Sequence, residues 1–270
     1  MENKRILITG FSGSIGSELF RQLAEKNEIF GIDLDETRMF DLIEEYQLKG
    51  CKVRGIVGDV ADSVMLEDVY RTFRPEIVFH AAARKHVKPM EETPMEAIRT
   101  NVIGTYNLLK YKVDKFINIS TDKAANPNCV MGATKRLTEL LVRQAGYVSV
   151  RFGNVLGSRG SVIPFWQGQI DRGEPLTVTD SKMERYFMSI PEAVNLVIEA
   201  AEIGESGQII ILDMGQKVNI LELAQKILKE SGRDTGIKMI GARPGESITE
   251  CLMSESEQKI AKKVNNFWII

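Results

Sequence analysis

The sequence predicts an α/β protein built on a doubly wound parallel sheet, with a smaller C-terminal lobe. Three observations predict this fold class. Short apolar runs alternate with amphipathic segments through residues 1–152, a glycine-rich turn follows the first apolar run directly, and the alternation loosens after residue 152. Strands that are joined through helices in this rhythm form parallel sheets with right-handed crossovers.

The expected strands are short runs rich in Ile, Val and Phe: Arg5–Thr9, Glu28–Ile32, Val53–Val57, Ile77–His80, Phe116–Ile119 and Val148–Phe152. The expected helices are amphipathic: Ile15–Glu25, Glu36–Leu48, Val64–Phe73, Pro94–Leu109, Pro191–Ala201 and Ile220–Lys229. Loops rich in Gly, Ser and Pro are expected at Gly153–Pro164, Arg172–Tyr186 and Ile240–Ser247. We therefore divide the chain into residues 1–152 and a lobe of residues 153–270, interleaved with the first domain.

Composition excludes several classes of protein. The 35 basic and 37 acidic residues of the 270-residue chain leave a formal charge of −2, which offers no electrostatic reason to expect a nucleic acid or an anionic membrane as partner. His80 and His86 are the only histidines, so a three-histidine metal site is excluded and no metal is expected. Three widely spaced cysteines, no long apolar run and no signal-peptide pattern favour a reducing, cytoplasmic location.

A nucleotide site is expected at the first β–α turn. Gly10-Phe-Ser-Gly13-Ser-Ile-Gly16 follows the first strand and opens the first helix, where glycines let the backbone approach a pyrophosphate. The second strand leads to Asp33, placed to accept hydrogen bonds from an adenosine ribose, and the third leads to Asp59-Val60 near the adenine. A ligand-free turn explains the glycines alone, but the three features in order predict a Rossmann-like dinucleotide domain.

The carboxylate of Asp33 favours NAD, because it would repel the 2′-phosphate of NADP. Arg38 lies close enough in sequence to leave NADP open, and a plain surface role fits it equally well. The residues expected to bind the cofactor are Gly10, Ser12, Gly13, Ser14, Ile15, Gly16, Asp33, Arg38, Asp59, Val60, Ala81, Ala82, Ala83, Asn101 and Lys135.

Further motifs carry a family resemblance. The glycines are spaced GxxGxxG, and the later motifs occur in this order: His80-Ala-Ala-Ala-Arg84-Lys85-His86-Val87, Asn101-Val-Ile-Gly-Thr105, Ser120-Thr-Asp-Lys-Ala124, Met131-Gly-Ala-Thr-Lys135, Arg151-Phe-Gly-Asn-Val155 and Arg243-Pro-Gly-Glu246. Over nearly the whole chain they resemble the extended short-chain dehydrogenases/reductases. Within these they are similar to the UDP-N-acetylglucosamine 4,6-dehydratases of the CapD-like polysaccharide biosynthesis family, in its methionine-bearing branch.

The resemblance implies a reaction. UDP-N-acetylglucosamine would be oxidised at C4, lose water across C5 and C6, and regain hydride at C6, giving a 4-keto-6-deoxy sugar for surface polysaccharide or glycan synthesis. The nicotinamide cofactor would be tightly bound and regenerated in each cycle. The branch further implies retention of configuration at C5, and the enzyme would work as a homo-oligomer.

The same resemblance implies the catalytic residues. Lys123 would be the base at C5, Asp122 the acid at the C6 oxygen, and Thr121 a hydroxyl bonded to the sugar near O4. A basic Lys123 needs a lowered pKa, which an apolar cleft and nearby Lys135 would provide. From the residues alone an exposed ion pair at a strand end would be favoured, and the match to the family motif reverses this interpretation.

Two helical positions complete the set. In the family, the equivalent of Lys135 bonds the nicotinamide ribose, and an asparagine at the position of Asn101 holds an active-site water. Most short-chain dehydrogenases carry a tyrosine base where this chain has Met131, and a thioether moves no proton. We interpret Met131 as a mark of the methionine-bearing branch rather than of a catalytically dead protein, and Asp122 is then the candidate group for the O4 proton.

The substrate is expected beyond these residues. The segments Arg151–Val155 and Ser158–Ser161 would frame the sugar and UDP. Arg185 and Arg243 would suit the diphosphate, because guanidinium groups pair with phosphate oxygens. For each arginine taken alone a surface ion pair is the commoner use. The loop after the fourth strand could equally contact another subunit. The residues expected to bind substrate are Lys85, His86, Asn154, Arg159, Ser161, Val162, Arg185, Arg243 and Glu246.

Two other functions remain open from the sequence. A UDP-sugar epimerase would share the C4 oxidation, yet would need no acid and base at C5 and C6, so Asp122 and Lys123 favour the dehydratase. A non-catalytic nucleotide-binding regulatory protein is supported only by Met131.

Overall fold

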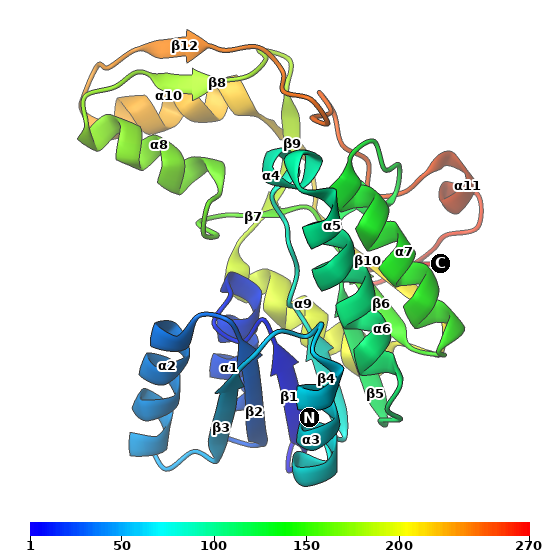
Figure 1. Ribbon diagram of the computed structural model, residues 1–270. Coiled ribbons are helices and arrows are strands. Elements are labelled where there is room, and N and C mark those ends of the chain that lie inside the picture. Colours follow the sequence, from blue (N-terminus) through cyan, green and yellow to red (C-terminus); the bar gives the residue numbers. More distant parts are fainter.

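The computed structural model describes residues 1–270, and its centre is a nine-stranded sheet in the order β13-β14-β10-β6-β5-β4-β1-β2-β3 (Figure 1). The strands run parallel from β3 to β10, whereas β14 and β13 are antiparallel. The nine strands of this sheet are β1 (Arg5–Thr9), β2 (Glu28–Asp33), β3 (Val53–Val57), β4 (Ile77–His80), β5 (Lys115–Ile119), β6 (Val148–Arg151), β10 (Ile209–Leu212), β13 (Lys262–Val264) and β14 (Phe267–Ile269). The doubly wound α/β class predicted from the alternating pattern is confirmed.

Helices cover both faces of this sheet. On β1, Ile6 and Ile8 pack with residues of α1, α2 and α9, while Leu7 packs on the opposite face with residues of α3, α6 and α7. The helices are α1 (Ser14–Leu23), α2 (Glu36–Leu48), α3 (Ser63–Phe73), α4 (Val87–Glu92), α5 (Pro94–Ala97), α6 (Gly104–Leu109), α7 (Val130–Gln144) and α9 (Ile190–Ile203). None of them combines the length and the hydropathy that crossing a bilayer requires.

The expected helix Pro94–Leu109 contains a π-helical turn. Between α5 and α6 the backbone follows a π-helix, η1 (Ile98–Ile103), which carries Asn101. Gly104 follows, and a Cβ there would lie 2.5 Å from Cγ2 of Val60, so only glycine lets the helix approach the loop after β3 this closely. Such turns concentrate at functional sites, because the extra residue redirects one side chain.

The C-terminal lobe stands above the carboxyl ends of the parallel strands (Figure 1). Its small core joins Trp166 and Ile170 to Leu176, Val178 and Ile220. It contains α8 (Val162–Asp171), α10 (Ile220–Ser231) and the short strands β7 (Asn154–Val155), β8 (Leu176–Val178), β9 (Glu184–Met188), β11 (Lys217–Asn219) and β12 (Ile237–Met239). Helix α11 (Glu255–Gln258) lies apart from them, beside α7 (Figure 1).

The two segments of the chain share the main sheet. Strands β10, β13 and β14 belong to residues 153–270 yet extend the sheet of the first domain, with Ile211 of β10 opposite Trp268 of β14. The apolar C-terminus therefore packs on the body of the protein. The strands β7 to β9 lie mainly in segments that the sequence predicted as loops, and most of α8 lies between two of these loops, where no element was predicted. Short segments with few periodic positions give little pattern.

Candidate active site

A cavity of about 1160 Å³ lies between the carboxyl ends of the parallel strands and the C-terminal lobe. It begins at the turn after β1, where the strand order reverses toward β4, and such reversals form the ligand crevice of open α/β sheets. Most residues predicted for the site line it: Gly10, Gly13, Ser14, Ile15, Gly16, Asp33, Asp59, Val60, Ala81, Ala82, Ala83, Lys85, His86, Thr121, Lys123, Met131, Lys135, Asn154, Arg159, Ser161, Val162, Arg185, Arg243 and Glu246. Ser12, Arg38, Asn101 and Asp122 do not.

The glycine turn fits a pyrophosphate group. Gly10 has a φ of +67°, and a Cβ on it would lie 2.6 Å from the backbone N of Ala82. A Cβ on Gly16 would lie 2.0 Å from the carbonyl O of Gly10. No side chain caps α1 at its N-cap residue Gly13. The first N–H groups of the helix therefore face the cavity side without a protein partner, as an anion requires.

Asp33 holds this turn together. Its carboxylate accepts hydrogen bonds from the N–H groups of Ser12 at 2.9 Å, Leu34 at 2.7 Å and Asp35 at 3.1 Å. It also lines the cavity, so lone pairs remain for a ribose. The expected role of Arg38 in cofactor binding needs correction. Its half-exposed guanidinium pairs with Asp35 at 3.4 Å, and Arg38 itself does not line the cavity.

Arg159 was expected beside the sugar, but it lies over the glycine turn. Its guanidinium donates to the carbonyl of Ser12 and to Oδ2 of Asp35 at 3.3 Å, and its N–H donates to Oγ of Ser14 at 3.1 Å. Lys85 donates to the carbonyl of Arg159 at 2.8 Å. The loops after β4 and β7 therefore contact each other over the glycine turn. The expected place of Arg159 beside the sugar needs correction, because its side chain lies at this turn.

Thr121, Asp122 and Lys123 form the turn that follows β5. Asp122 starts a 3₁₀ turn, η2 (Asp122–Ala124), and its Oδ1 accepts from the hydroxyl of Thr121 at 2.9 Å. Lys123 Nζ donates to the same oxygen at 3.0 Å. The Asp122 side chain is fully buried and that of Lys123 is 19 % exposed, so this is no solvated surface ion pair.

A third carboxyl, Glu250, joins this pair and was missed by the sequence reasoning. Its Oε2 lies 2.8 Å from Nζ of Lys123. Burial alone would lower the pKa of Lys123, but the charges of Asp122 and Glu250 raise it above its ordinary value. This corrects the expected lowering. No motif or periodicity marks Glu250, which follows a loop far from Lys123 in sequence.

Helix α7 carries Lys135 and Met131 into the cavity wall. Lys135 is 4 % exposed with Nζ 3.4 Å from Oδ1 of Asn118, and burial lowers the pKa of Lys135 to about 8. Met131, also 4 % exposed, packs with Met90 and Cys129. Neither side chain is therefore an ordinary surface residue of the helix.

Asn101 has a different role from the expected one. From the π-turn its amide donates to the carbonyl of Arg84 at 3.1 Å and to the hydroxyl of Thr134 at 2.9 Å. Its Oδ1 accepts the N–H of Arg84 at 2.8 Å. The side chain thus fixes the loop after β4 to α7, which corrects its placement among the cavity residues.

The end of the cavity where substrate was expected is lined by residues of the C-terminal lobe. Asn154, Ser161 and Val162 line the cavity, and Oγ of Ser161 is buried without a hydrogen-bond partner. Arg243 and Glu246 lie at its more exposed rim.

Two arginines expected here bind protein instead. Arg185 donates to the carbonyls of Ser247 at 2.7 Å and Ile248 at 2.9 Å, and pairs with Glu250 at 3.3 Å. Its diphosphate role therefore needs correction, because most of its donors are occupied. Arg151 is wholly buried and also lies outside the cavity.

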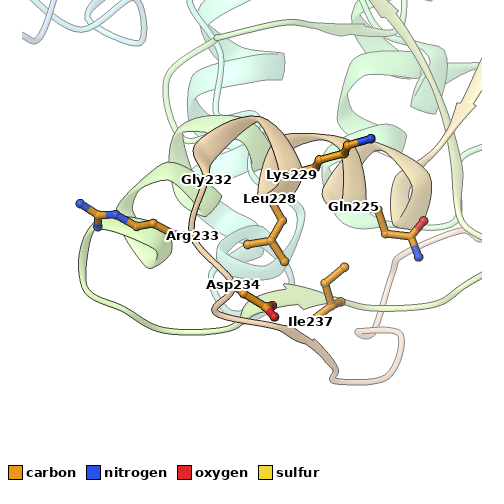
Figure 2. Close-up of a pocket in the computed structure, with 7 residues that line it drawn as sticks. All are labelled: Gln225, Leu228, Lys229, Gly232, Arg233, Asp234 and Ile237. Atoms are coloured by element: carbon orange, nitrogen blue, oxygen red, sulfur yellow. The ribbon is translucent and has the colours of Figure 1, made fainter.

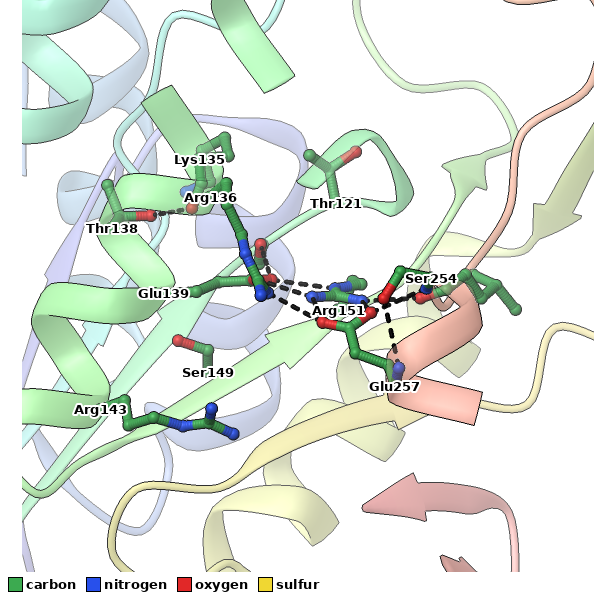
Figure 3. Close-up of polar contacts among 12 residues, drawn as sticks. Thr121, Lys135, Arg136, Thr138, Glu139, Arg143, Ser149, Arg151, Ser254 and Glu257 are labelled. Atoms are coloured by element: carbon green, nitrogen blue, oxygen red, sulfur yellow. Dashed lines mark hydrogen bonds and ion pairs between the residues drawn. The ribbon is translucent and has the colours of Figure 1, made fainter. Parts of the chain in front are cut away.

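Figure 3 shows the buried ion-pair cluster around Arg151. Its guanidinium pairs with Glu139 of α7 at 2.7 Å and with Glu257 of α11 at 2.8 Å, and it donates to the carbonyl of Leu252 at 2.9 Å. Arg136 joins at the edge, 2.8 Å from Glu257. The cluster thereby fastens the C-terminal segment to β6 and α7.

A second hollow of about 340 Å³ lies at the C-terminal end of α10 (Figure 2). Its lining includes Leu228, Lys229, Arg233 and Ile237. No residue predicted for the site lines this hollow, and none of its residues lines the cavity described above.

Comparison with known proteins identifies the family. A family model described as polysaccharide biosynthesis protein matches residues 6–270. The capsular polysaccharide biosynthesis protein CapD of Staphylococcus aureus is 42 % identical over 98 % of this chain. A UDP-glucose 4-epimerase of Rickettsia canadensis (strain McKiel) is 36 % identical over 99 % of this chain and 83 % of its own length.

The chain spans only about half of CapD, 48 % of its length. Among solved structures, Pen from Bacillus thuringiensis matches with a TM-score of 0.94 and 34 % identity, covering 100 % of this chain and 89 % of that one. The match of the family model over almost the whole chain agrees with the motifs that predicted it. The chain belongs to the polysaccharide biosynthesis protein family.

Proposed function

We propose that the protein is a UDP-N-acetylglucosamine 4,6-dehydratase that uses NAD and retains the configuration at C5. One observation carries this proposal: Thr121 and Lys123 line the same cavity as the glycine turn, with Asp122 directly behind them. An acid and a base beside a nucleotide-binding turn suit elimination of water from a sugar that is oxidised in place.

The residues around the turn fit a dinucleotide. The N-terminus of α1 would bind the pyrophosphate, Asp33 the adenosine ribose, and Lys135 the nicotinamide ribose. A nicotinamide cofactor bound there supplies hydride acceptance at C4 and hydride return at C6. Because a Cβ on Gly10 or Gly16 would collide with backbone, the turn has the shape for close approach of such a group.

The chain's own residues supply the proton transfers. Thr121 orients the sugar near O4, and Asp122 takes the O4 proton during C4 oxidation and gives it to the C6 oxygen as it leaves. Lys123 removes the C5 proton and gives a proton back to C5 when hydride returns to C6. Asn154 and Ser161 contact the substrate from the C-terminal lobe, and Arg243 and Glu246 face its nucleotide at the rim.

A UDP-sugar 4-epimerase is the second candidate, favoured by the relative that carries this name at 36 % identity. An epimerase also oxidises C4 but leaves the C5 proton and the C6 hydroxyl in place. Removal of the O4 proton needs only one base, so the second group of the buried Asp122–Lys123 pair has no task in an epimerase, and the pair therefore supports the dehydratase.

The product mass tests the proposal. Purified protein incubated with UDP-N-acetylglucosamine should yield a product lighter by one water, with deuterium at C5 when the solvent is deuterated water. An unchanged mass with a new sugar would indicate the epimerase.

Lys123→Ala should lose roughly 10²–10⁴-fold in dehydration and stop exchanging the C5 proton, because the general base is gone. It should keep its cofactor, measured by extraction after denaturation. Dehydration at the wild-type rate with normal C5 labelling would place the base elsewhere.

A further inference from the structure

A buried network of five polar side chains connects the glycine turn to helix α7. Its members are Thr9, His80, Thr105, Asn101 and Thr134, and each of them is at most 3 % exposed. The network starts at Thr9, the last residue of β1, and passes through His80 at the end of β4 to Thr105 of α6. None of its members lines the cavity. Its influence on the site must therefore pass through the residues that it touches.

The position of one hydrogen on His80 follows from its neighbour Thr105. Oγ1 of Thr105 lies 2.5 Å from the carbonyl O of Asn101. A carbonyl only accepts hydrogen bonds, so the single hydroxyl hydrogen of Thr105 lies in this contact. Nε2 of His80 lies 2.9 Å from the same hydroxyl and must then be the donor. His80 therefore carries a hydrogen on Nε2.

The other ring nitrogen of His80 is an acceptor. Its Nδ1 lies 2.7 Å from Oγ1 of Thr9, and this hydroxyl also accepts the N–H of Ala82 at 3.4 Å. A hydrogen on Nδ1 would leave the hydroxyl hydrogen of Thr9 buried without an acceptor, which is costly. Burial lowers the pKa of His80 to about 3, and the charge of Lys135 acts in the same direction. The imidazole is therefore neutral and in its Nε2–H form.

Beyond Thr105 the network reaches the wall of the cavity. The side-chain amide of Asn101, whose carbonyl accepts from Thr105, donates to Oγ1 of Thr134 at 2.9 Å. The hydroxyl of Thr134 donates in turn to the carbonyl O of Met131 at 2.7 Å. Met131 lines the cavity, as does Lys135, which directly follows Thr134. The network thus ends beside the lysine that is proposed to bind the nicotinamide ribose.

At its other end the network holds the glycine turn. The carbonyl of Thr9 accepts the N–H of Ala81 at 3.0 Å, and Gly10 follows directly. A Cβ on Gly10 would lie 2.6 Å from the backbone N of Ala82, so the turn and the loop after β4 touch here. The hydroxyl that accepts from Ala82 is the one that donates to His80. The network therefore fixes the contact that shapes the nucleotide end.

The two ends of the network coincide with the two groups proposed to hold the dinucleotide. Every hydrogen of its hydroxyl, imidazole and amide groups has an acceptor, and buried networks that are fully satisfied rigidify the elements that they join. We propose that His80, as a neutral Nε2–H imidazole, is the positioning residue that holds the glycine turn and helix α7 at a fixed separation. Its effect on turnover rests on the proposed function, because that reaction needs the cofactor and Lys135 held together.

The form of His80 can be measured directly, because the chain has only two histidines. In protein labelled with ¹⁵N in the histidine rings, NMR distinguishes a ring nitrogen that carries hydrogen from one that accepts, and His86→Gln assigns the signals. His80 should show hydrogen on Nε2 and none on Nδ1, and should stay so from about pH 5 to about pH 8. An imidazolium or an Nδ1–H form in the wild type overturns the proposal.

Thr105→Val removes the acceptor of His80 and keeps the shape of the side chain. The Nε2 hydrogen, which a hydrogen bond shifts downfield, should move upfield in the proton spectrum. The kcat of dehydration should fall by about 10-fold or more, because small displacements of the groups around a reaction are costly. KM for the sugar nucleotide should stay close to wild type, since Thr105 does not line the cavity. Thr105→Ser keeps the hydroxyl and should restore both the signal and kcat.

Thr72→Val is the matched control. Thr72 also donates to the carbonyl four residues earlier in its helix, that of Asp68 at 2.8 Å, but it lies on α3 and does not line the cavity. It should leave the His80 signals, kcat and KM unchanged. Where Thr105→Val does not fold, Thr9→Val cuts the network on the other side of His80 and should lower kcat in the same way.

The outcomes separate this proposal from the proposed function. If a folded valine variant, Thr105→Val or Thr9→Val, dehydrates the sugar with the wild-type kcat, the positioning role is overturned and the proposed function stands. If wild-type His80 has the expected form but the wild type does not dehydrate UDP-N-acetylglucosamine, the hydrogen-bonded network holds and the proposed function fails.

Discussion

Met131 and Lys135 occupy one face of α7 and should differ sharply when replaced. Met131 supplies shape beside Met90 and Cys129, so Met131→Leu, which conserves volume, should cost less than about 1.5 kcal/mol of stability and retain most activity. Lys135→Met should lose more, about 10²-fold in kcat/KM, because it removes the buried cation. The pKa of Lys135 near 8 also predicts the direction of the pH dependence. The positive charge of Lys135, and the activity that needs it, should decline as the pH rises through about 8. Both variants are compared by steady-state kinetics across pH. Equal losses of kcat/KM would contradict the assignment of a packing role to Met131 and of a required cation to Lys135.

At the scale of single residues, the sequence predicted those site residues that lie close together in the chain, within one motif. Asp122 and Lys123 lie together because they are neighbours in the chain, and Lys135 follows Met131 by one turn of a helix. Glu250 could not be predicted in the same way. Its contact with Lys123 joins positions 127 residues apart, and only tertiary packing creates it. Arg159 shows the same limit, since its partner Asp35 lies 124 residues away.

At the scale of elements, the Arg151 cluster decides how the C-terminal segment is held. Glu257→Ala would leave the buried guanidinium with one carboxylate fewer, and breaking a buried ion pair costs about 3–5 kcal/mol. Urea unfolding should show this loss. Glu255→Ala in the same short helix, exposed and without a part in the ion pairs of the cluster, should cost less than about 1 kcal/mol. Equal midpoints for the two variants would mean that the cluster does not stabilise the fold.

The cluster also has a pH dependence with a definite sign. Burial alone would raise the pKa of Glu257, but its hydrogen bonds to Arg151 lower it from 4.5 to about 2. A folded-state pKa below the unfolded value stabilises the protein above about pH 4.5, and this contribution is lost as the pH falls toward about 2. The acid-induced loss of stability should therefore be smaller in Glu257→Ala than in the wild type.

Elements were predictable where their pattern is long or strictly repeated. The strands β1 to β6 and helix α2 follow their apolar runs closely, because both faces of the parallel sheet are buried. Helix α8 and strands β7 to β9 were missed, since their apolar residues, such as Trp166, serve a small separate core rather than the main sheet. The addition of β14 to the edge of β10 is a long-range pairing that no local pattern specifies.

At the scale of the whole molecule, one cavity is lined by residues of both parts of the chain, 1–152 and 153–270. Its walls extend from Gly10 after β1 to Glu246 in the C-terminal lobe, and Arg159 spans from that lobe to the glycine turn. A ligand that fills the nucleotide end therefore contacts both parts. Binding should stabilise the protein as a unit, because any ligand that binds only the folded state shifts the unfolding equilibrium.

Thermal unfolding with each dinucleotide tests the proposed cofactor at this scale. At a concentration 100 times its Kd, NAD should add about 2.7 kcal/mol of stability and raise the unfolding midpoint. NADP at the same concentration should raise the midpoint less, because Asp33 lines the cavity and, as the proposed ligand of the adenosine ribose, its carboxylate would repel a 2′-phosphate. Asp33→Asn removes that charge and should narrow the difference between the dinucleotides, whereas Asp68→Asn, an exposed carboxylate on α3, should leave it unchanged. A larger shift with NADP than with NAD in the wild type would contradict the NAD assignment, and since Arg38 lies outside the cavity it would point to Arg159 as the residue that binds the extra phosphate.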